Sequence, residues 1–405
     1  MLVVRDRVGG STFTIRDSAF DYTDFGGAYV GPTQRRVAWM AKDLGLQFYR
    51  VYDDQKHVLQ LRNLRSTFSG VLPEYYRPST IRWSCSTSTI YAELNPRCSD
   101  VPTEAPWKAK KAKEWDTITF REYLEKTWWT GVAVDAGTTL CRVMLTAEPH
   151  EVSLLAFLWY IAAAQGLFAS SARRTAHKSG SSSAGATTLG TCAGACRRRK
   201  RKALVASGSR LAGGRPRRWS NSGDVDRQNV QSEVRHQCLL QAILNRVALE
   251  PSLPSLKLHL IQRIPLGCVI KTMTFYRKAF WIEKGPSWQA DVQKGPVIFC
   301  IDDTKPNGRH PCLVGFIVAD NAKDFARFSE EGKKKLVTKH YAETFDVTGL
   351  PCSRDERRTV LGMFADGSGV NCVCFGRIRC FWCRTYQMVA FCLHQFMSAK
   401  NCKHI

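Results

Sequence analysis

Two glycine pairs near the start of the chain, Gly9-Gly10 and Gly26-Gly27, constrain the fold more than any other feature of the sequence. The second pair is followed by Ala28, Tyr29 and a proline turn, a combination that ordinary packing does not favour. A glycine backbone can approach a flat ligand that any Cβ atom would push away, and Tyr29 can then face that ligand. A double glycine before an aromatic residue is by itself more typical of a plain turn, so the interpretation depends on the residues around it.

Longer blocks of sequence favour the ligand-binding interpretation. The stretch DFGGAYVGPTQ at 24–34, with RDRVGG at 5–10, resembles the flavin-contacting region of the monoamine oxidases. The resemblance continues in the family's order through 105–109, 114–116, 145–153, 157–160, 263–271, 302–306 and 315–317. Residues from about 4 to 159 and from 262 to 349 resemble this family, and the remaining segments do not.

This resemblance implies a mixed α/β (α+β) fold. We expect an incomplete FAD-binding Rossmann-like domain and a mixed-sheet substrate domain of the flavin amine oxidase type, interrupted by a disordered basic insertion. The expected boundaries are 1–51 for the remnant of the FAD-binding domain, 52–165 and 262–349 for the two parts of the substrate domain, 166–261 for the basic segment of low order, and 350–405 for a cysteine-rich tail unrelated to the family.

The resemblance also implies roles for individual residues. Lys271, at the end of the apolar strand Val269-Ile270, falls on a lysine that hydrogen-bonds a water at flavin N5, although a lysine in such a place ordinarily reaches the surface. The residues implied to contact FAD are Arg5, Gly9, Gly10, Gly26, Gly27, Ala28 and Tyr29. Those that fall on substrate-cavity positions are Leu140, Val143, Met144, Phe299, Ile301 and Phe316, which core packing would also explain.

The activity implied by the family is FAD-dependent oxidation of a primary or related amine, with O₂ converted to H₂O₂. Such chemistry needs a dry aromatic pocket against the flavin more than it needs acid–base groups. The family also implies a homodimer at the mitochondrial outer membrane. The longest apolar run, 154–164, is only 11 residues, whereas a membrane-spanning helix needs about 20. We therefore expect no transmembrane helix in this chain and a soluble or loosely associated protein.

Several motifs and residues that hold FAD in the family are absent from this sequence or replaced. No G-x-G-x-x-G turn, which holds the cofactor pyrophosphate in the family, occurs in it. Val3 stands where the family has an acidic residue for the ribose, and the cysteine that would carry the flavin is absent after Gly349. We expect the chain as written to be impaired or inactive as an amine oxidase. A catalytically dead fragment is the alternative.

The formal net charge of +24 favours a second alternative. Residues 165–260 contain 17 Lys and Arg against 4 Asp and Glu, including the basic run Arg197–Lys202. Low apolar content predicts disorder here, and such a run can bind nucleic acid by neutralising phosphates. Because Trp219 is the only aromatic residue available for base stacking between 169 and 259, any such binding would be nonspecific.

The tail at 350–405 contains cysteine and histidine, the residue types that bind zinc, but not at the spacing of a zinc site. Cys380 and Cys383 form a C-x-x-C pair, followed by His394, Cys402 and His404 at irregular distances. We therefore predict no metal site.

Hydrophobic periodicity predicts the secondary structure of the parts that resemble the family. Strands are expected at 12–15, as a pair within 58–68, and at 266–276, 297–301 and 313–319. Helices are expected at 33–44, 119–127, 151–164 and 322–336, with a local helix at 237–249.

Overall fold

The computed structural model describes the chain in several stretches. These are residues 2–3, 14–30 without 19 and 27, 39–49 without 40 and 44–46, 57–68 without 63, 93–163 without 129, six short strands between 177 and 249, 252–262, 267–283, 289–346 without 293, and 358–363.

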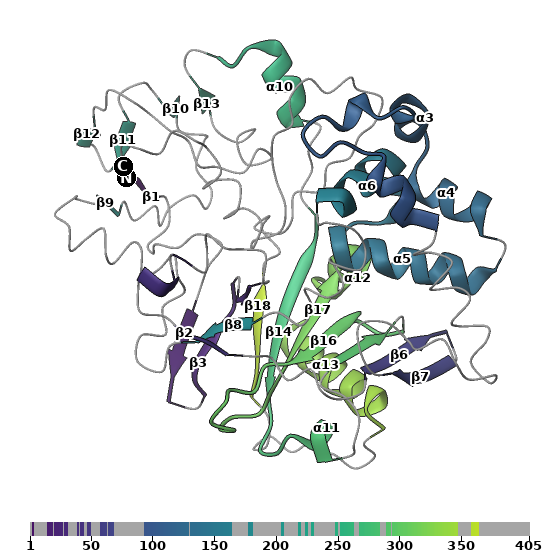
Figure 1. The fold of residues 1–405 in the computed structure, drawn as a ribbon. Helices are drawn as coiled ribbons and strands as arrows, with labels where there is room; N and C mark the ends of the chain where they lie inside the picture. Colours follow the sequence, from purple (N-terminus) through teal and green to yellow (C-terminus); the bar gives the residue numbers. More distant parts are fainter. Residues whose placement is uncertain are drawn as a thin grey trace.

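A mixed sheet lies at the centre of the described part (Figure 1). Its strands follow the order β18-β14-β17-β16-β15-β6-β7, and every neighbouring pair is antiparallel except the parallel pair β15–β6. The sheet therefore joins two segments far apart in the sequence, and it confirms the predicted mixed-sheet α/β fold. The strands are β6 (His57–Leu61), β7 (Leu64–Phe68), β14 (Val269–Phe275), β15 (Gln289–Val292), β16 (Phe299–Asp302), β17 (Cys312–Val318) and β18 (Arg358–Met363).

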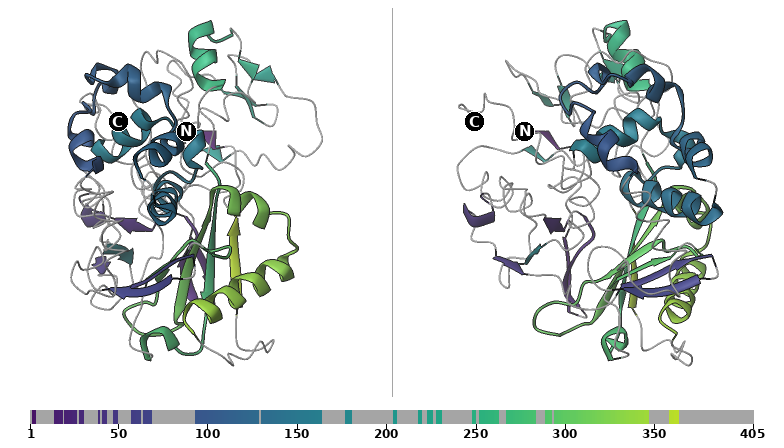
Figure 2. Two further views of the ribbon diagram at one scale, coloured as in Figure 1. Left: turned by 90° about the vertical axis from the view of Figure 1, so that its right-hand side faces the viewer. Right: turned by 45° about the vertical axis from the view of Figure 1, so that its right-hand side comes forward.

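Both faces of this sheet are buried at β14 and β17. Accordingly, β17 reads as a continuous apolar run, whereas β14 also buries Lys271, Thr272 and Thr274. Helices α12 (Ala319–Phe325) and α13 (Glu330–Thr344) pack on one face (Figure 2). The cluster on that face includes Ile270, Leu313, Ile317, Phe325, Val337 and Tyr341. The cluster on the opposite face includes Phe20, Phe25, Met273, Phe275, Ile301, Cys312 and Val314.

An N-terminal hairpin supplies the cover of the second face. Strands β2 (Thr14–Asp17) and β3 (Asp21–Asp24) pair antiparallel around a tight turn, where Asp21 has a φ of 64°. From this turn Phe20 stacks on Phe275 of β14, with ring centroids 4.9 Å apart. Burying such a ring contributes about 1.5–3 kcal/mol, so the hairpin is docked on the sheet by apolar contact.

The remaining short strands form small sheets beside this core. Strand β8, which lies within the predicted basic segment, pairs with both β4 and β5 from the N-terminal region. The elements are β1 (Leu2–Val3) with β9 (Leu204–Val205), β4 (Tyr29–Val30) and β5 (Gln47–Tyr49) with β8 (His177–Gly180), β10 (Arg218–Trp219) with β13 (Ala248–Leu249), β11 (Gly223–Val225) with β12 (Gln228–Val230), and helix α10 (Ser255–Gln262).

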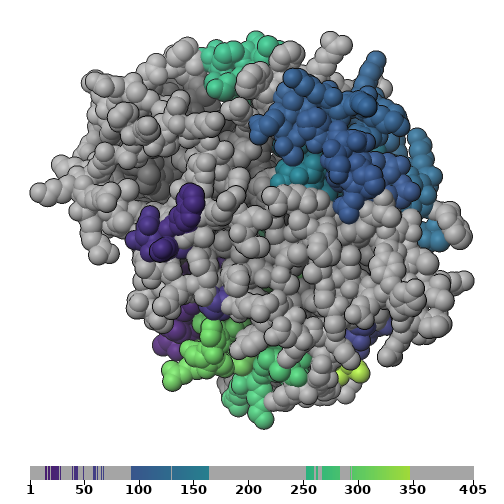
Figure 3. All heavy atoms as spheres, viewed as in Figure 1, coloured from purple at the N-terminus to yellow at the C-terminus, as the bar shows by residue number. Residues whose placement is uncertain are grey.

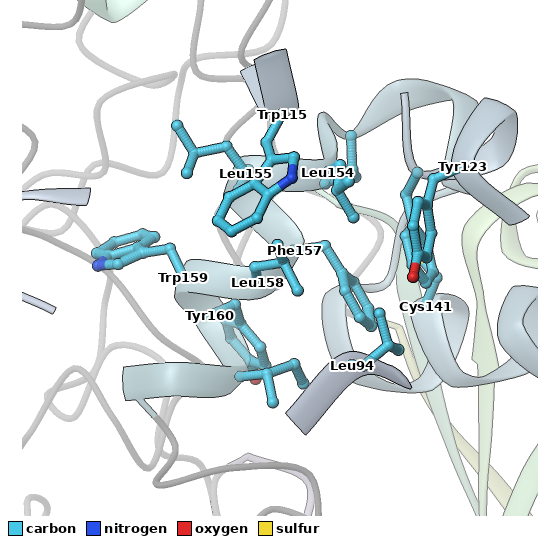
Figure 4. Close-up of a cluster of buried hydrophobic side chains, with 14 of the residues drawn as sticks. Leu94, Trp115, Tyr123, Cys141, Leu154, Leu155, Phe157, Leu158, Trp159 and Tyr160 are labelled. Atoms are coloured by element: carbon cyan, nitrogen blue, oxygen red, sulfur yellow. The ribbon is translucent and has the colours of Figure 1, made fainter. Parts of the chain in front are cut away.

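A helical part, residues 93–163, has a core of its own (Figure 4). Every residue of helix α6 from Leu154 to Ile161 is buried, and Phe157 stacks on Phe120 of α4 with ring centroids 3.8 Å apart. A helix buried all round serves as the centre of a bundle. Around it lie η2 (Pro106–Lys108), α3 (Ala112–Thr117), α4 (Phe120–Thr127), α5 (Gly131–Leu145) and η3 (Pro149–Glu151), with α6 itself at Leu154–Ala163.

Glu148 joins the helical part to the sheet part. Its buried carboxylate accepts hydrogen bonds from Arg142 Nε at 2.9 and 3.0 Å and from the backbone N–H of Asp320, in α12, at 3.3 Å. Nearby, the Cys268 N–H donates to the Thr146 carbonyl at 3.2 Å, and an added Cβ at Gly267 would collide with Thr146. These contacts hold together the two predicted parts of the substrate domain.

Most of the predicted elements occur, with shifted ends. Helix α4 begins at a capping box in which Thr119 and Glu122 exchange hydrogen bonds, and Ser153 caps α6 by accepting from the Ala156 N–H at 3.2 Å. The single helix predicted at 322–336 is wrong: α12 ends at Phe325, and Ser329 caps a second helix, α13. Helix α5 was not predicted.

Other predictions fall on residues that the structure does not describe. These include the basic run at 197–202, all the cysteines after residue 350, and most of the predicted helices at 33–44 and 237–249. The domain boundaries therefore stay predictions.

Candidate active site

Lys271, Phe316 and Phe299 form a row across three neighbouring strands. Lys271 on β14 lies directly opposite Phe316 on β17, and Phe316 lies directly opposite Phe299 on β16. Side chains at opposite positions of an antiparallel pair share one face of the sheet. The two phenylalanine rings stack with centroids 5.7 Å apart, and both side chains are partly exposed. The row thus places an apolar aromatic wall beside a lysine.

The Lys271 side chain turns towards the N-terminal hairpin instead of reaching the surface. Its Nζ donates hydrogen bonds to the carbonyls of Asp24 at 2.5 Å and Gly26 at 3.2 Å, and only 4% of the residue is exposed. A buried cation is stable only where polar groups replace its water, and these carbonyls do so. The fold therefore brings the predicted catalytic residue to Gly26, one of the predicted FAD-contacting glycines, across 245 residues of sequence.

A second buried lysine, Lys305, reaches the same strand. Its Nζ donates to the Tyr22 carbonyl and lies 3.9 Å from the centroid of the Tyr22 ring. On the molecular surface, N-terminal residues (purple) lie against light-green residues of the 300–346 region (Figure 3). No role is predicted for Lys305 from the sequence. The signal that could have identified it is its position in the block Asp302-Asp303-Thr304-Lys305-Pro306.

Buried carboxyl groups accompany the lysines. Asp24 is 4% exposed and accepts a hydrogen bond from the Thr14 hydroxyl at 2.5 Å. Asp302, at the end of β16, accepts from the Thr304 N–H at 2.7 Å. Burial raises the pKa of the Asp302 carboxyl, and the hydrogen bonding from Thr304 opposes that rise. The second face of the sheet near the hairpin thus combines apolar packing with enclosed polar groups.

The structure separates the remaining predicted pocket residues. Ile301 lies two residues after Phe299 on β16 and pairs with Val314 of β17. It belongs to the apolar cluster that contains Phe25. Met144 is instead buried in the helical core, and Leu140 packs against that core. Val143 lies on the same helix and is partly exposed. The described contacts do not bring these three residues of α5 to the aromatic wall.

The predicted FAD contacts are described only in part. Gly26 and Ala28 are buried, and the backbone of Tyr29 pairs with Lys178 in the small sheet of β4 and β8. Arg5, Gly9, Gly10 and Gly27 lie outside the described residues.

The described residues lack two other kinds of functional element. No group of three or more His, Cys, Asp or Glu side chains there is placed to hold a metal ion. Similarly, none of the helices that the structure describes is both long and apolar enough to cross a membrane.

Comparison with known proteins gives a consistent result. Residues 238–361 match the family model of flavin containing amine oxidoreductase. The chain is 32% identical over 365 residues to amine oxidase [flavin-containing] B of Homo sapiens, covering 85% of this chain and 65% of that protein. It is 30% identical over 361 residues to amine oxidase [flavin-containing] A of Equus caballus, covering 85% of this chain and 64% of the relative. The chain thus spans slightly less than two thirds of each relative.

Solved structures share the fold at lower identity. A putrescine oxidase double mutant superimposes with a TM-score of 0.72 at 21% identity, covering 89% of this chain and 78% of that one. Cyclohexylamine oxidase from Brevibacterium oxydans superimposes with a TM-score of 0.73 at 20% identity, with the same coverage of 89% and 78%.

Proposed function

Because the chain belongs to the flavin-containing amine oxidase family, we propose that it binds FAD and that the flavin ring meets an amine beside Lys271, Phe316 and Phe299. The observation that carries this proposal is the contact of Lys271 with the Gly26 carbonyl. It joins two segments, 245 residues apart in the sequence, that the resemblance assigns to the cofactor and to the reaction.

The residues at this site fit a flavin ring. A planar ring with polar edges needs close backbone on one side, an apolar wall, and a polar group at its rim. Gly26 gives backbone without a side chain, the stacked rings of Phe299 and Phe316 give the wall, and Lys271 gives the polar group. Bound FAD would supply the redox chemistry: it would take up the α-hydrogen of the amine as a hydride equivalent together with the N–H proton, leaving the imine, and would give these two electrons and two protons to O₂ as H₂O₂.

The residues of the chain would prepare the amine and the ring for that chemistry. Phe299 and Phe316 would exclude water and hold the uncharged amine by apolar contact. Lys271 would keep a hydrogen-bond donor at the edge of the ring, in a buried position where its electrostatic effect is strong. Substrates of this site are expected to be primary or related amines with an apolar substituent.

Anaerobic mixing of FAD-loaded protein with a primary amine tests the proposal. We expect the amine to bleach the flavin, and Lys271→Met to slow reduction or reoxidation of the flavin much more than it weakens amine binding. Lys339→Met, at an exposed lysine of α13, is the matched control. Unchanged rates in Lys271→Met would remove this residue from the mechanism.

We further propose that protein made of these 405 residues turns amines over slowly or not at all. Without a G-x-G-x-x-G turn, the sequence lacks a known device for the pyrophosphate. Each missing charge-assisted hydrogen bond weakens FAD binding by about 1.5–3 kcal/mol. Val3, in β1, cannot accept a hydrogen bond through its side chain from the ribose. Amine-dependent peroxide formation at rates typical of oxidases would overturn this part of the proposal and the alternative of a dead fragment.

The family also supports a homodimer at the mitochondrial outer membrane. We propose both for the protein in cells, where fractionation and size-exclusion chromatography test them. If all of the protein were recovered from the cytosol as a monomer, both the membrane location and the homodimer would be contradicted.

The charge of +24 supports a second candidate function, nonspecific binding of nucleic acid through Arg197–Lys202. Binding of this kind weakens steeply with salt and shows no sequence preference. Replacing the six basic residues with Ser should weaken retention on DNA at low salt and reduce its dependence on salt. Equal retention of this variant would exclude the run as the binding site.

A further inference from the structure

Two buried lysines take the place of a neighbouring strand along one edge of β3. In the described part of the chain, β3 pairs with β2 at one edge only. The carbonyls of Tyr22 and Asp24 belong to residues two apart, so both point to the same edge of the strand. There they accept hydrogen bonds from Lys305 and Lys271, respectively.

Lys305 is held in place by a tightly bonded turn between β16 and β17. The Thr304 N–H donates to the Asp302 carboxylate at 2.7 Å, and the Thr304 hydroxyl accepts from the Cys312 N–H at 3.2 Å. The Gly308 N–H closes the turn by donating to the Lys305 carbonyl at 2.9 Å. With its backbone fixed in this way, Lys305 can deliver its side-chain nitrogen to a defined point on β3.

The Tyr22 side chain completes the Lys305 site. Only 6% of Lys305 and 7% of Tyr22 are exposed, and the lysine nitrogen lies over the tyrosine ring. A cation over an aromatic face is attracted by the electrons of the ring, more strongly where water is excluded. Backbone and side chain of one residue thus hold the same lysine.

We propose that Lys305 is a positioning residue: with Lys271 it fixes the edge of β3 opposite β2, and so sets the Asp24–Gly26 backbone against which the flavin ring would lie. The role in flavin binding rests on the function proposed above, whereas the anchoring of β3 does not. Lys271 holds the C-terminal end of β3 at the Asp24 carbonyl, next to Gly26. Lys305 holds the strand two residues earlier, at the Tyr22 carbonyl. Removing Lys305 should therefore loosen the glycine segment although Lys305 does not itself touch it.

Hydrogen exchange of the flavin-free protein tests the anchoring. In Lys305→Met, which keeps the length of the side chain and removes its charge, we expect amides of residues 20–26 to exchange about 10- to 100-fold faster, as for loss of a charge-assisted hydrogen bond. Amides of α6, in the separate helical core, report whether the global fold is kept. Lys339→Met is the control, because that lysine is exposed on α13. Unchanged exchange at 20–26 in Lys305→Met would overturn the proposal.

A second variant decides the case in which Lys305→Met loses its global fold. Tyr22→Leu removes the ring under the lysine and keeps the backbone carbonyl. We expect about 3- to 10-fold faster exchange confined to residues 20–26, as for loss of a buried cation–ring contact. Exchange in Tyr22→Leu equal to that of the unmodified protein would then refute the role of the site.

Measuring FAD binding distinguishes the anchoring of β3 from its effect on the flavin. A positioning role predicts that Lys305→Met weakens FAD binding at least tenfold and changes the visible absorption band of the FAD that remains bound, which a uniform loss of stability would not do. A normal FAD affinity and band despite faster exchange would refute the link to the flavin and leave the anchoring intact. Failure of the unmodified protein to bind FAD would contradict the proposed function, while the exchange result would still decide the anchoring.

Discussion

Acidification should destabilise the sheet part of the protein through His340. This residue of α13 is 5% exposed, and burial lowers its pKa from 6.5 to about 4. Its ring faces Gly295, where an added Cβ would collide with it, and its Nε2 lies 3.5 Å from the Thr344 hydroxyl. The folded protein therefore holds His340 neutral at pH values at which the unfolded chain protonates it.

The sign and size of the effect follow from these two pKa values. A group whose pKa is lowered by folding contributes no penalty above its unfolded pKa of 6.5, and its protonation favours the unfolded state as the pH falls from 6.5 towards 4. The linkage relation gives a loss of about 2 kcal/mol at pH 5 and about 3 kcal/mol at pH 4. Such a loss is a large fraction of the ordinary stability of a domain, about 5–15 kcal/mol.

Urea unfolding at pH 7.5 and pH 5.0 measures this effect. Because other groups also titrate, the informative quantity is the difference between the unmodified protein and His340→Gln, a neutral replacement. We expect the free energy of unfolding to fall between the two pH values by about 2 kcal/mol more in the unmodified protein than in the variant. His259→Gln, at an exposed histidine of α10, is the matched control. Equal pH dependence in His340→Gln and the unmodified protein would refute the reasoning.

Three further substitutions test the packing that positions the site. Gly315→Ala should destabilise the protein by about 1–3 kcal/mol, because its Cβ would lie 2.7 Å from the Thr272 Oγ1 and closer still to the Tyr341 hydroxyl; a thermal unfolding midpoint within error of the unmodified protein would contradict this close packing. Thr119→Ala should cost about 1 kcal/mol in urea unfolding by removing the cap of α4, and Thr117→Ala, which lies outside the cap, should cost less. Glu148→Gln should raise the hydrogen-exchange rate at the start of α12, because it weakens the hydrogen bonds that Glu148 accepts from Arg142 and from the Asp320 N–H. Unchanged exchange there would show that Glu148 does not hold the helical part against the sheet part.

The sheet could be predicted from the sequence because its signal is local. Strands β14 and β17 consist mainly of apolar and β-branched residues, and β6 and β7 flank a short turn in which Arg62 has a φ of 53°. Helix α5 was missed because two glycines and two threonines lower its intrinsic helix propensity. It is stabilised by packing instead: an added Cβ at Gly137 would lie 2.7 Å from the side chains of Leu124 and Trp128.

The site was less predictable than the fold because its contacts join distant segments. The resemblance placed Lys271 and Gly26 in one site, but nothing in the sequence indicates that Lys271 donates to the Asp24 and Gly26 carbonyls. Lys305 was overlooked for the same reason, since its partner Tyr22 lies 283 residues earlier. The break between α12 and α13 did have a local signal: Ser329 is followed by two glutamates, the usual start of a helix.

Retention of flavin by purified protein tests whether this chain holds FAD at the glycine backbone beside Lys271. After incubation with excess FAD and removal of the unbound cofactor, we expect a weak but visible flavin absorption band in the unmodified protein. The band should be lost in Gly26→Val, whose methyl groups would occupy the space between the backbone and the ring, and kept in Gly332→Ala, at the partly exposed first turn of α13. Absence of the band from the unmodified protein, or an equal band in Gly26→Val, would contradict the account.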